Sequence, residues 1–230
     1  MARIFFVLAV LSLAMLAANF IVGLWIGDFN TPAQQYREAF RRYEDLRRSR
    51  HASPGEVAQA RQDVQDAEAR IAAPRDRKTI HFYLGVASSL LAMLVSSITI
   101  TYFVGTCRWC REVVETYQLP SEFAERSAAL KRRTFPWAVL AMLMIIGIAA
   151  LGGLSDPSTP VSQQNPGLPA AMVMWHYAAA IVGLVLVAWS FWVQQTRIAE
   201  HYVVIQQILD EVHRVRKERG LATEDNLEAA

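Results

Sequence analysis

The sequence predicts an all-α integral membrane protein, a four-helix bundle in which four helices cross a lipid bilayer. Four long stretches contain no Asp, Glu, Lys or Arg: 4–27, 80–107, 134–155 and 157–196. Each holds an apolar block of about 19–25 residues, and a helix of about 20 residues crosses the hydrocarbon core of a bilayer. The six tryptophans lie near the ends of these blocks, as expected for an interfacial aromatic belt. We therefore expect spans at approximately 4–26, 80–104, 136–154 and 170–193.

The first apolar block has a rival interpretation as a secretory signal. Ala14, Ala17 and Ala18 would then form its small-residue cleavage region. The apolar run continues past them through Phe20 and Trp25, which is long for a signal core and suits a span. We expect the block to be retained, and residues 1–230 to form a single membrane domain.

Residues 31–73 are expected to form a helical hairpin outside the membrane. Thr31-Pro32-Ala33-Gln34 and Ser53-Pro54-Gly55-Glu56 both have the pattern of a helix start. Apolar residues then recur at helical spacing in both segments, and Pro74 is expected to end the second helix. The apolar faces consist of Tyr36, Phe40, Tyr43 and Leu46 in the first helix, and Val57, Ala60, Val64, Ala67 and Ile71 in the second.

Helical extensions of the second and fourth spans are expected at 105–135 and 195–219. The first should run to about Tyr117, turn at Leu119-Pro120-Ser121 and continue as a short helix, before Pro136 starts the third span. The fourth span should continue as one helix of about 50 residues to a stop at Gly220. We expect the two extensions to pair like a coiled coil. The expected contacts join Val113, Val114 and Tyr117 to Ile198, Tyr202 and Ile205.

The distribution of basic residues favours cytoplasmic termini. One side of the membrane carries Arg3, six basic residues in 105–135 and five from 195 onward, while the loop 155–169 on the other side has none. Residues 27–79 carry eleven basic and nine acidic residues, and Arg75, Arg77 and Lys78 oppose this orientation. Long segments of mixed charge cross regardless of charge. We expect a multi-pass protein of the cell membrane, the inner membrane of a bacterium.

Composition and motifs indicate a protein without enzymatic activity. A net charge of +2 argues against binding nucleic acid, and no ionisable Asp, Glu, Lys or Arg lies inside a span to serve transport. No phosphate-binding loop, H-E-x-x-H or G-x-S-x-G motif occurs. Amphipathic helices on both sides offer surfaces for other membrane subunits or a second copy of this chain. The leading hypothesis is a structural, assembly or accessory subunit. A transmembrane signal relay from the hairpin to the cytoplasmic helices is an alternative.

Two histidines near the membrane boundary raise a second alternative, a b-type cytochrome. His81 and His176 each open a span that enters from the same side, and each lies four residues before a small residue, Gly85 or Ala180. Two neutral imidazoles on facing helices can ligate a haem. Against this, His81 lies at the boundary, where it can reach water, and the two depths differ by about one helical turn. The main expectation is therefore no cofactor and no metal.

Cys107-Arg108-Trp109-Cys110 is a C-x-x-C motif at the other end of the second span. No second cysteine pair exists to complete a zinc site, which would have to be shared between two chains or completed by His201 near the same surface. Neighbouring arginines favour thiolates, so a redox role for Cys107 and Cys110 is a minor candidate. Two small apolar residues at a helix interface are the simpler interpretation.

Stripes of small residues at helical spacing indicate close packing of the second and fourth spans. Small side chains at intervals of three or four let membrane helices approach closely. The predicted packing residues are Gly85, Ser89, Ala92, Ser96, Ala180 and Gly183.

Overall fold

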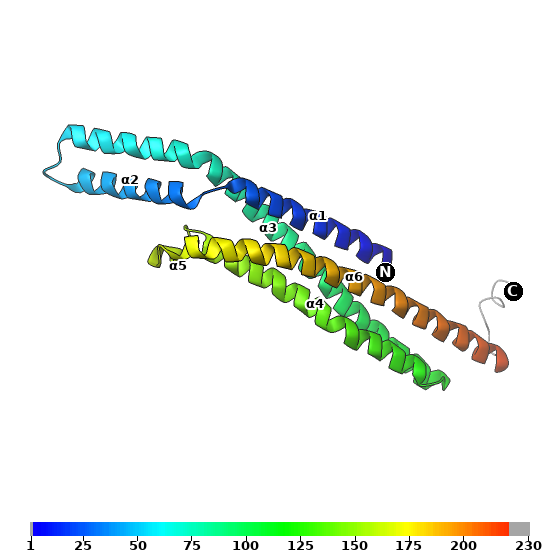
Figure 1. The fold of residues 1–230 in the computed structure, drawn as a ribbon. Helices are drawn as coiled ribbons and strands as arrows, with labels where there is room; N and C mark the ends of the chain where they lie inside the picture. Colours follow the sequence, from blue (N-terminus) through cyan, green and yellow to red (C-terminus); the bar gives the residue numbers. More distant parts are fainter. Residues whose placement is uncertain (1, 221–230) are drawn as a thin grey trace. The chain divides into compact units, whose positions relative to one another are not determined.

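A computed structural model describes residues 2–220, and the regular structure in that range is entirely helical (Figure 1). The predicted all-α helical bundle is confirmed. The helices are α1 (Ala2–Ile26), α2 (Asn30–Arg48), α3 (Pro54–Tyr117), α4 (Glu122–Ser155), α5 (Pro160–Gln164) and α6 (Leu168–Glu218).

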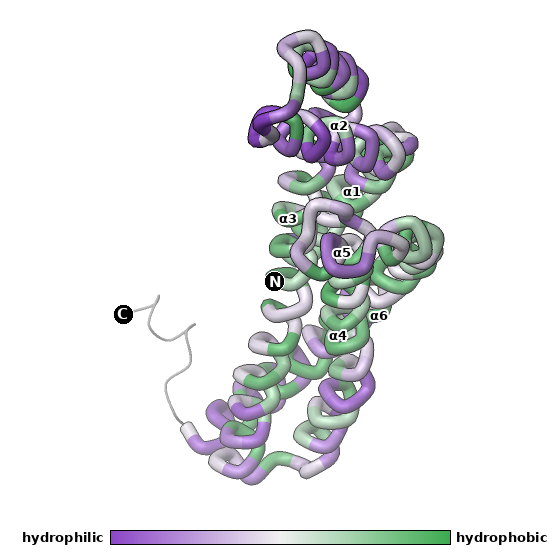
Figure 2. The backbone as a smooth tube through the Cα atoms, turned by 90° about the vertical axis from the view of Figure 1, so that its left-hand side faces the viewer, coloured by the Kyte–Doolittle hydropathy of each residue, from purple (hydrophilic) through white to green (hydrophobic). Residues whose placement is uncertain are grey.

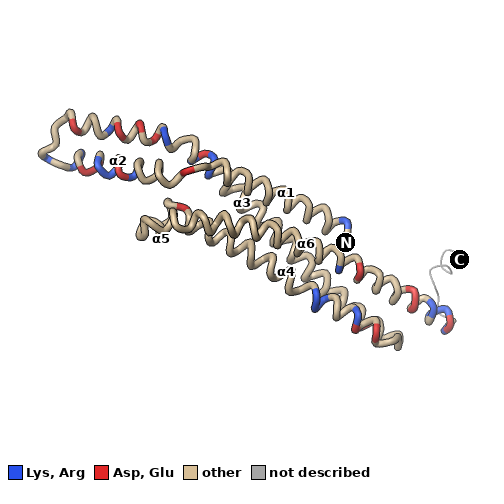
Figure 3. The backbone as a smooth tube through the Cα atoms, viewed as in Figure 1, with Lys and Arg blue, Asp and Glu red and all other residues tan. Residues whose placement is uncertain are grey.

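Four of these helices, α1, α3, α4 and α6, are long and apolar enough to cross a membrane. Their apolar segments keep large side chains exposed, such as Leu90 at 64% and Val185 at 67%. Figure 2 shows the hydrophobic stretches along the same helices, and Figure 3 shows that Lys, Arg, Asp and Glu lie outside these stretches. Apolar surface on this scale requires lipid around it. The chain is a multi-pass membrane protein.

Two prolines that we expected to mark helix boundaries lie inside helices instead. Pro74 lies within α3, which continues from the hairpin into the second span, and Pro136 lies within α4, which has no break before the third span. Each proline removes one backbone donor, but the neighbouring turns of a long helix hold the backbone in place. The expected separate short helix before Pro136 is therefore wrong, whereas the expected single helix of about 50 residues is confirmed by the 51 residues of α6.

The contacts of the chain divide it into two compact units, which we describe separately. Within the described residues, unit 1 takes 2–13, 91–145 and 185–220, and unit 2 takes 14–90 and 146–184.

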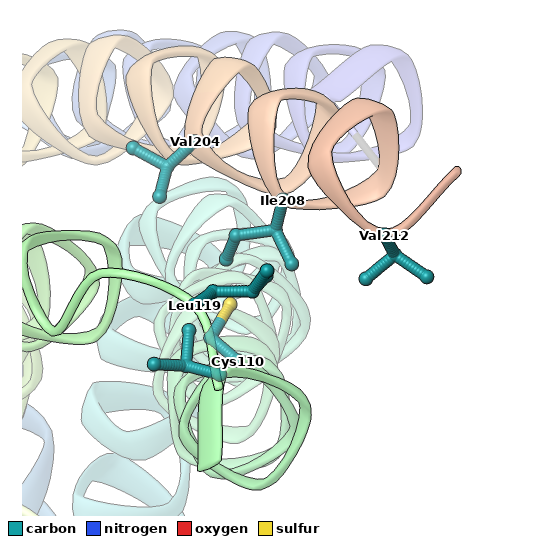
Figure 4. Packing of buried hydrophobic residues seen from close by; sticks show 6 residues of the cluster. Cys110, Leu119, Val204, Ile208 and Val212 are labelled. Carbon is teal, nitrogen blue, oxygen red and sulfur yellow. The ribbon is translucent and has the colours of Figure 1, made fainter. Parts of the chain in front are cut away.

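In unit 1, α3 and α6 pair through a buried apolar cluster. Figure 4 shows the six members of the cluster and labels Cys110, Leu119, Val204, Ile208 and Val212; the sixth member is Val114. Val113, Tyr117 and Ile205 pack against this cluster as predicted. Tyr202 was predicted at the same seam, but its side chain is 58% exposed. The buried face of α6 includes two polar residues, Gln194 and His201, and both are fully buried.

In unit 2, α2 and residues 54–73 of α3 form the predicted hairpin. Its second helix starts with a capping box, in which Ser53 N–H donates to Glu56 at 2.7 Å and Glu56 N–H donates to Ser53 Oγ at 3.2 Å. The first helix starts differently from the prediction, because Asp28 rather than Thr31 supplies the capping oxygen, 3.1 Å from Thr31 N. Ala60, Ala67 and Ile71 are buried as predicted, and Val57 and Val64 are half-buried, so the aliphatic face packs on α2.

Candidate functional site

Each unit holds one cluster of polar side chains around histidine. In unit 1, His201 of α6, Ser127 of α4, and Tyr102 and Cys107 of α3 form what we call the serine–histidine network. His201 and Ser127 are fully buried. Ser127 Oγ lies 2.7 Å from His201 Nε2, and Tyr102 Oη lies 3.1 Å from His201 Nδ1. Cys107 Sγ lies 3.1 Å from Ser127 Oγ and 3.7 Å from His201 Nε2.

One assignment of protons satisfies every member of this network. Tyr102 O–H donates to Nδ1 of His201, and Nε2–H of His201 donates to Ser127 Oγ. Ser127 O–H then donates to Cys107 Sγ, whose own S–H donates to the backbone oxygen of Ser127 at 3.4 Å. All four side chains are neutral in this arrangement. Burial lowers the pKa of His201 to about 4, in agreement with a neutral imidazole.

A second polar contact in unit 1 also joins α6 to α4. Ser190 O–H donates to the backbone oxygen of Trp137 at 2.7 Å, and Gln194 Nε2 donates to Ser190 Oγ at 2.9 Å. Interhelical bonds of this kind fix the register of packed helices.

The two cysteines of the C-x-x-C motif are free thiols in buried positions. Cys107 is 8% exposed and Cys110 is fully buried in the apolar cluster of α3 and α6 (Figure 4). Burial raises the pKa of both thiols, although hydrogen bonding with Ser127 acts in the opposite direction. A thiol held neutral and shielded is a poor nucleophile. Cys110 thus packs as an apolar side chain, whereas Cys107 is held by hydrogen bonds with Ser127. Among residues 2–220, no three His, Cys, Asp or Glu side chains are arranged to hold a metal ion.

The structure brings together the two histidines that the sequence singled out in unit 2. His81 of α3 and His176 of α6, which we call the histidine pair, have ring centroids 6.3 Å apart and ring planes at 83°. His81 Nδ1 lies 3.0 Å from the backbone oxygen of Asn19 in α1. Since a carbonyl oxygen only accepts, Nδ1 of His81 carries the proton and Nε2 has a free lone pair.

Glycines of α1 and α4 lie directly against the two imidazole rings. A Cβ at Gly23 would stand 2.9 Å from Cε1 of His81, and a Cβ at Gly152 would stand 3.1 Å from Cε1 of His176. Tyr177 O–H donates to the backbone oxygen of Gly23 at 3.3 Å. A larger residue at Gly23 would have to displace the His81 ring, and a larger residue at Gly152 would press against the His176 ring.

Two buried polar atoms beside the histidine pair lack a partner. His176 Nδ1 has no partner in hydrogen-bonding geometry, although the backbone of Ile148 lies near enough to interact with the ring. The side-chain oxygen of Asn19 is also buried and unpaired. A buried polar atom without a partner costs roughly 1–3 kcal/mol and calls for an explanation such as a ligand or a water molecule.

The predicted packing residues occupy interfaces to different extents. Ala92, Ser96 and Gly183 are buried, whereas Ser89, Gly85 and Ala180 are half-buried. Gly85 allows the close approach of Asn19, because a Cβ there would lie 3.1 Å from the Asn19 side-chain nitrogen.

Sequence reasoning missed Ser127 and Tyr102 and saw His201 only as a remote partner of the cysteines. Nothing local distinguishes Ser127 within its helical segment. His201 does carry a signal, since it lies three residues from both Ile198 and Val204 on the buried line of α6. Comparison with known proteins adds no assignment, because no family model, curated protein or solved structure matches the chain.

Proposed function

We propose that this protein is a non-enzymatic accessory or assembly subunit of a membrane complex, which binds its partner through the hairpin. The membrane would be the inner membrane of a bacterium, with the hairpin outside and the termini in the cytoplasm. The observation that carries the proposal is an exposed aromatic side chain on a charged, anchored hairpin. Phe40 is 44% exposed and stacks on Tyr36, with ring centroids 6.2 Å apart.

The surroundings of Phe40 are suited to protein recognition. Charged residues of both signs lie along the hairpin (Figure 3), and most of them are exposed. The ion pair between Arg42 Nη1 and Asp63 Oδ2, 3.7 Å apart, joins its two helices. Aromatic anchors within a polar rim dominate the energy of protein interfaces. The half-buried Tyr36 ring beneath Phe40 keeps the anchor in one orientation, which lowers the entropy lost on binding.

Polar contacts hold the base of the hairpin to the loop after α4. Arg37 Nη1 donates to the backbone oxygen of Pro157 at 2.7 Å, and Lys78 Nζ pairs with Asp156 at 2.7 Å. Burial acts to raise the pKa of Asp156, but its hydrogen bonds with Lys78 and Ser158 outweigh this and the pKa is lowered. The carboxylate therefore stays ionised at neutral pH. An anchored hairpin is a docking platform rather than a loose tether.

Site-specific crosslinking tests this proposal. A photo-crosslinking amino acid in place of Phe40 should give one defined product in intact cells, and the same amino acid in place of the exposed Gln65 should not. The Phe40→Glu variant should lose the crosslinked species from detergent co-purification. A product of twice the chain mass, carrying both of two tags, would identify the partner as a second copy. Equal products at both positions, or none at Phe40, would refute the proposal.

A signal relay is a second candidate, favoured by the continuity of α3 from Pro54 to Tyr117. A helix without a break can transmit a small shift from the hairpin to the buried Cys107. An antibody fragment raised against the hairpin should then change the rate at which Cys107 reacts with a thiol reagent in detergent. An unchanged rate with saturating fragment would eliminate the relay.

A further inference from the structure

We propose that His81 and His176 are the two axial ligands of an iron porphyrin bound within unit 2. This inference does not depend on the proposed subunit role. Its starting point is the distance between the rings. Two imidazoles on opposite sides of one metal ion, each with a metal–nitrogen bond of about 2 Å, have centroids about 6 Å apart. The observed separation is 6.3 Å, with ring planes at 83°.

The protonation of His81 suits this role. Its Nδ1–H donates to the backbone oxygen of Asn19, which fixes the ring and leaves the lone pair of Nε2 for a metal. Metal-binding histidines almost always hold their second nitrogen in this way. On the other ring, the buried and unpaired Nδ1 of His176 remains to be satisfied, and the backbone of Ile148 lies beside it. Ligation through Nε2 would fix Nδ1 as a donor toward that backbone.

The number of ligands selects a macrocycle over a bare ion. A protein zinc site needs four ligands, and among residues 2–220 no third His, Cys, Asp or Glu joins the histidine pair to hold a metal. An iron porphyrin supplies four equatorial nitrogens itself, so two histidines complete its coordination. The pair is a full axial set for haem and an incomplete site for zinc.

Two glycines keep side chains away from the sides of the histidine pair. A porphyrin plane is perpendicular to the line joining its two axial nitrogens, so its edges point sideways toward the flanking helices. Those helices are α1, with Gly23 against His81, and α4, with Gly152 against His176. Neither position presents a side chain to the pair, so only helix backbone stands beside the two rings. Helices α1 and α4 would have to move apart to admit the macrocycle.

Cations lie next to the pair on the polar side. Lys78 and Arg77 precede His81 by three and four residues, which places them over the same face of α3. Lys78 pairs with Asp156, and the Arg77 guanidinium lies 4.6 Å from the Trp25 ring centroid. Haem carries two carboxylates on one edge, and basic side chains at the membrane boundary would neutralise them while the apolar ring stays in the span.

The test uses the full chain, expressed with a haem precursor and purified in detergent. We expect a Soret band and, on reduction, the sharp visible bands of six-coordinate low-spin haem at one haem per chain. His81→Ala and His176→Ala should each abolish the low-spin spectrum. The exposed His51→Ala should leave it unchanged. Nearly perpendicular imidazole planes should also give a strongly anisotropic low-spin electron paramagnetic resonance signal.

Two further measurements separate ligation from misfolding. Free imidazole added to His176→Gly should restore the low-spin spectrum, which a merely structural role would not permit. Gly152→Leu should weaken haem binding, whereas Gly153→Leu, whose Cβ position has no neighbour within 4 Å, should not. Colourless wild-type protein that also fails to bind added haemin would overturn the proposal. A spectrum that survives in both histidine variants would do so as well.

Discussion

The two histidine clusters differ in how completely their hydrogen bonds are satisfied. In the serine–histidine network of unit 1, His201 uses both ring nitrogens, and Ser127 and Cys107 each donate and accept. In the histidine pair of unit 2, only His81 Nδ1 has a partner in hydrogen-bonding geometry, and His176 Nδ1 has none. A complete network stabilises one arrangement of helices, whereas a buried polar atom without a partner leaves room for a ligand or a water molecule. The comparison teaches that burial alone does not identify a functional histidine.

The largest expected contrast is between removing His201 and removing His176. His201→Ala empties a fully buried site and leaves Ser127 and Tyr102 without their partner, so it should lower the free energy of unfolding by about 3 kcal/mol or more. His176→Ala removes a half-buried ring whose Nδ1 has no partner, and should cost about 1 kcal/mol or less in haem-free protein. Denaturation of helical structure by added SDS, followed by circular dichroism, measures both. A larger loss of stability in His176→Ala than in His201→Ala would reverse the roles assigned to the two clusters.

Removing the central hydroxyl of the network should have the next largest effect. Ser127→Ala leaves His201 Nε2–H with only the weak acceptor Cys107 Sγ, 3.7 Å away, and removes the hydroxyl that donates to Cys107, so we expect a loss of roughly 1–3 kcal/mol. Thr196→Ala is the control, because the exposed Thr196 hydroxyl only donates to the backbone of its own helix. The same denaturation assay compares them. Equal losses in the two variants would mean that the network contributes nothing specific.

Acidification should weaken unit 1 through His201. Its pKa is about 6.5 when exposed and about 4 in the folded protein, because burial favours the neutral ring. A lowered folded pKa gives stability that is present above pH 6.5 and is lost as the pH falls toward 4. The midpoint of thermal unfolding should therefore fall over this range in the wild type. His201→Gln, which has no titrating ring, should show a smaller fall, and identical pH profiles would contradict the assignment.

The smallest effect should come from the ion pair at the base of the hairpin. Lys78 and Asp156 have side chains 26% and 25% exposed, so Lys78→Gln should cost about 1 kcal/mol at low salt. Arg108→Gln breaks an ion pair of similar length in unit 1, with Glu112, that is open to water, and we expect no measurable change. Chemical denaturation at low and high salt distinguishes them. A loss for Arg108→Gln as large as that for Lys78→Gln would remove the special role of the anchored pair.

Local patterns predicted the helices and some of their ends. Glu56 and Ser53 form the predicted capping box, and Gly220 adopts the left-handed conformation expected at a helix stop, with φ +66. The two prolines misled the prediction, because Pro74 and Pro136 are compatible with a helix whose other turns are intact. Whether a proline ends a helix depends on what surrounds it.

The candidate sites were only partly predictable. The sequence identified His81 and His176 as a pair on the same side of the membrane, but estimated depths one helical turn apart. The contact between their rings depends on the packing of α3 and α6 and on glycines in two further helices. For Ser127, no local pattern exists, since its partner His201 is 74 residues away in the chain.

By itself, the sequence determined that this chain is a helical membrane protein, because uninterrupted apolar length and the exclusion of charge are properties of single segments. It also determined the hairpin, since capping and helical periodicity act within a few residues. Only the tertiary structure decided that His201 has a hydrogen-bond partner for each ring nitrogen and that His176, in the histidine pair, keeps an unpaired Nδ1. Hydrogen bonding between helices depends on positions far apart in the chain, and no spacing within one helix specifies them.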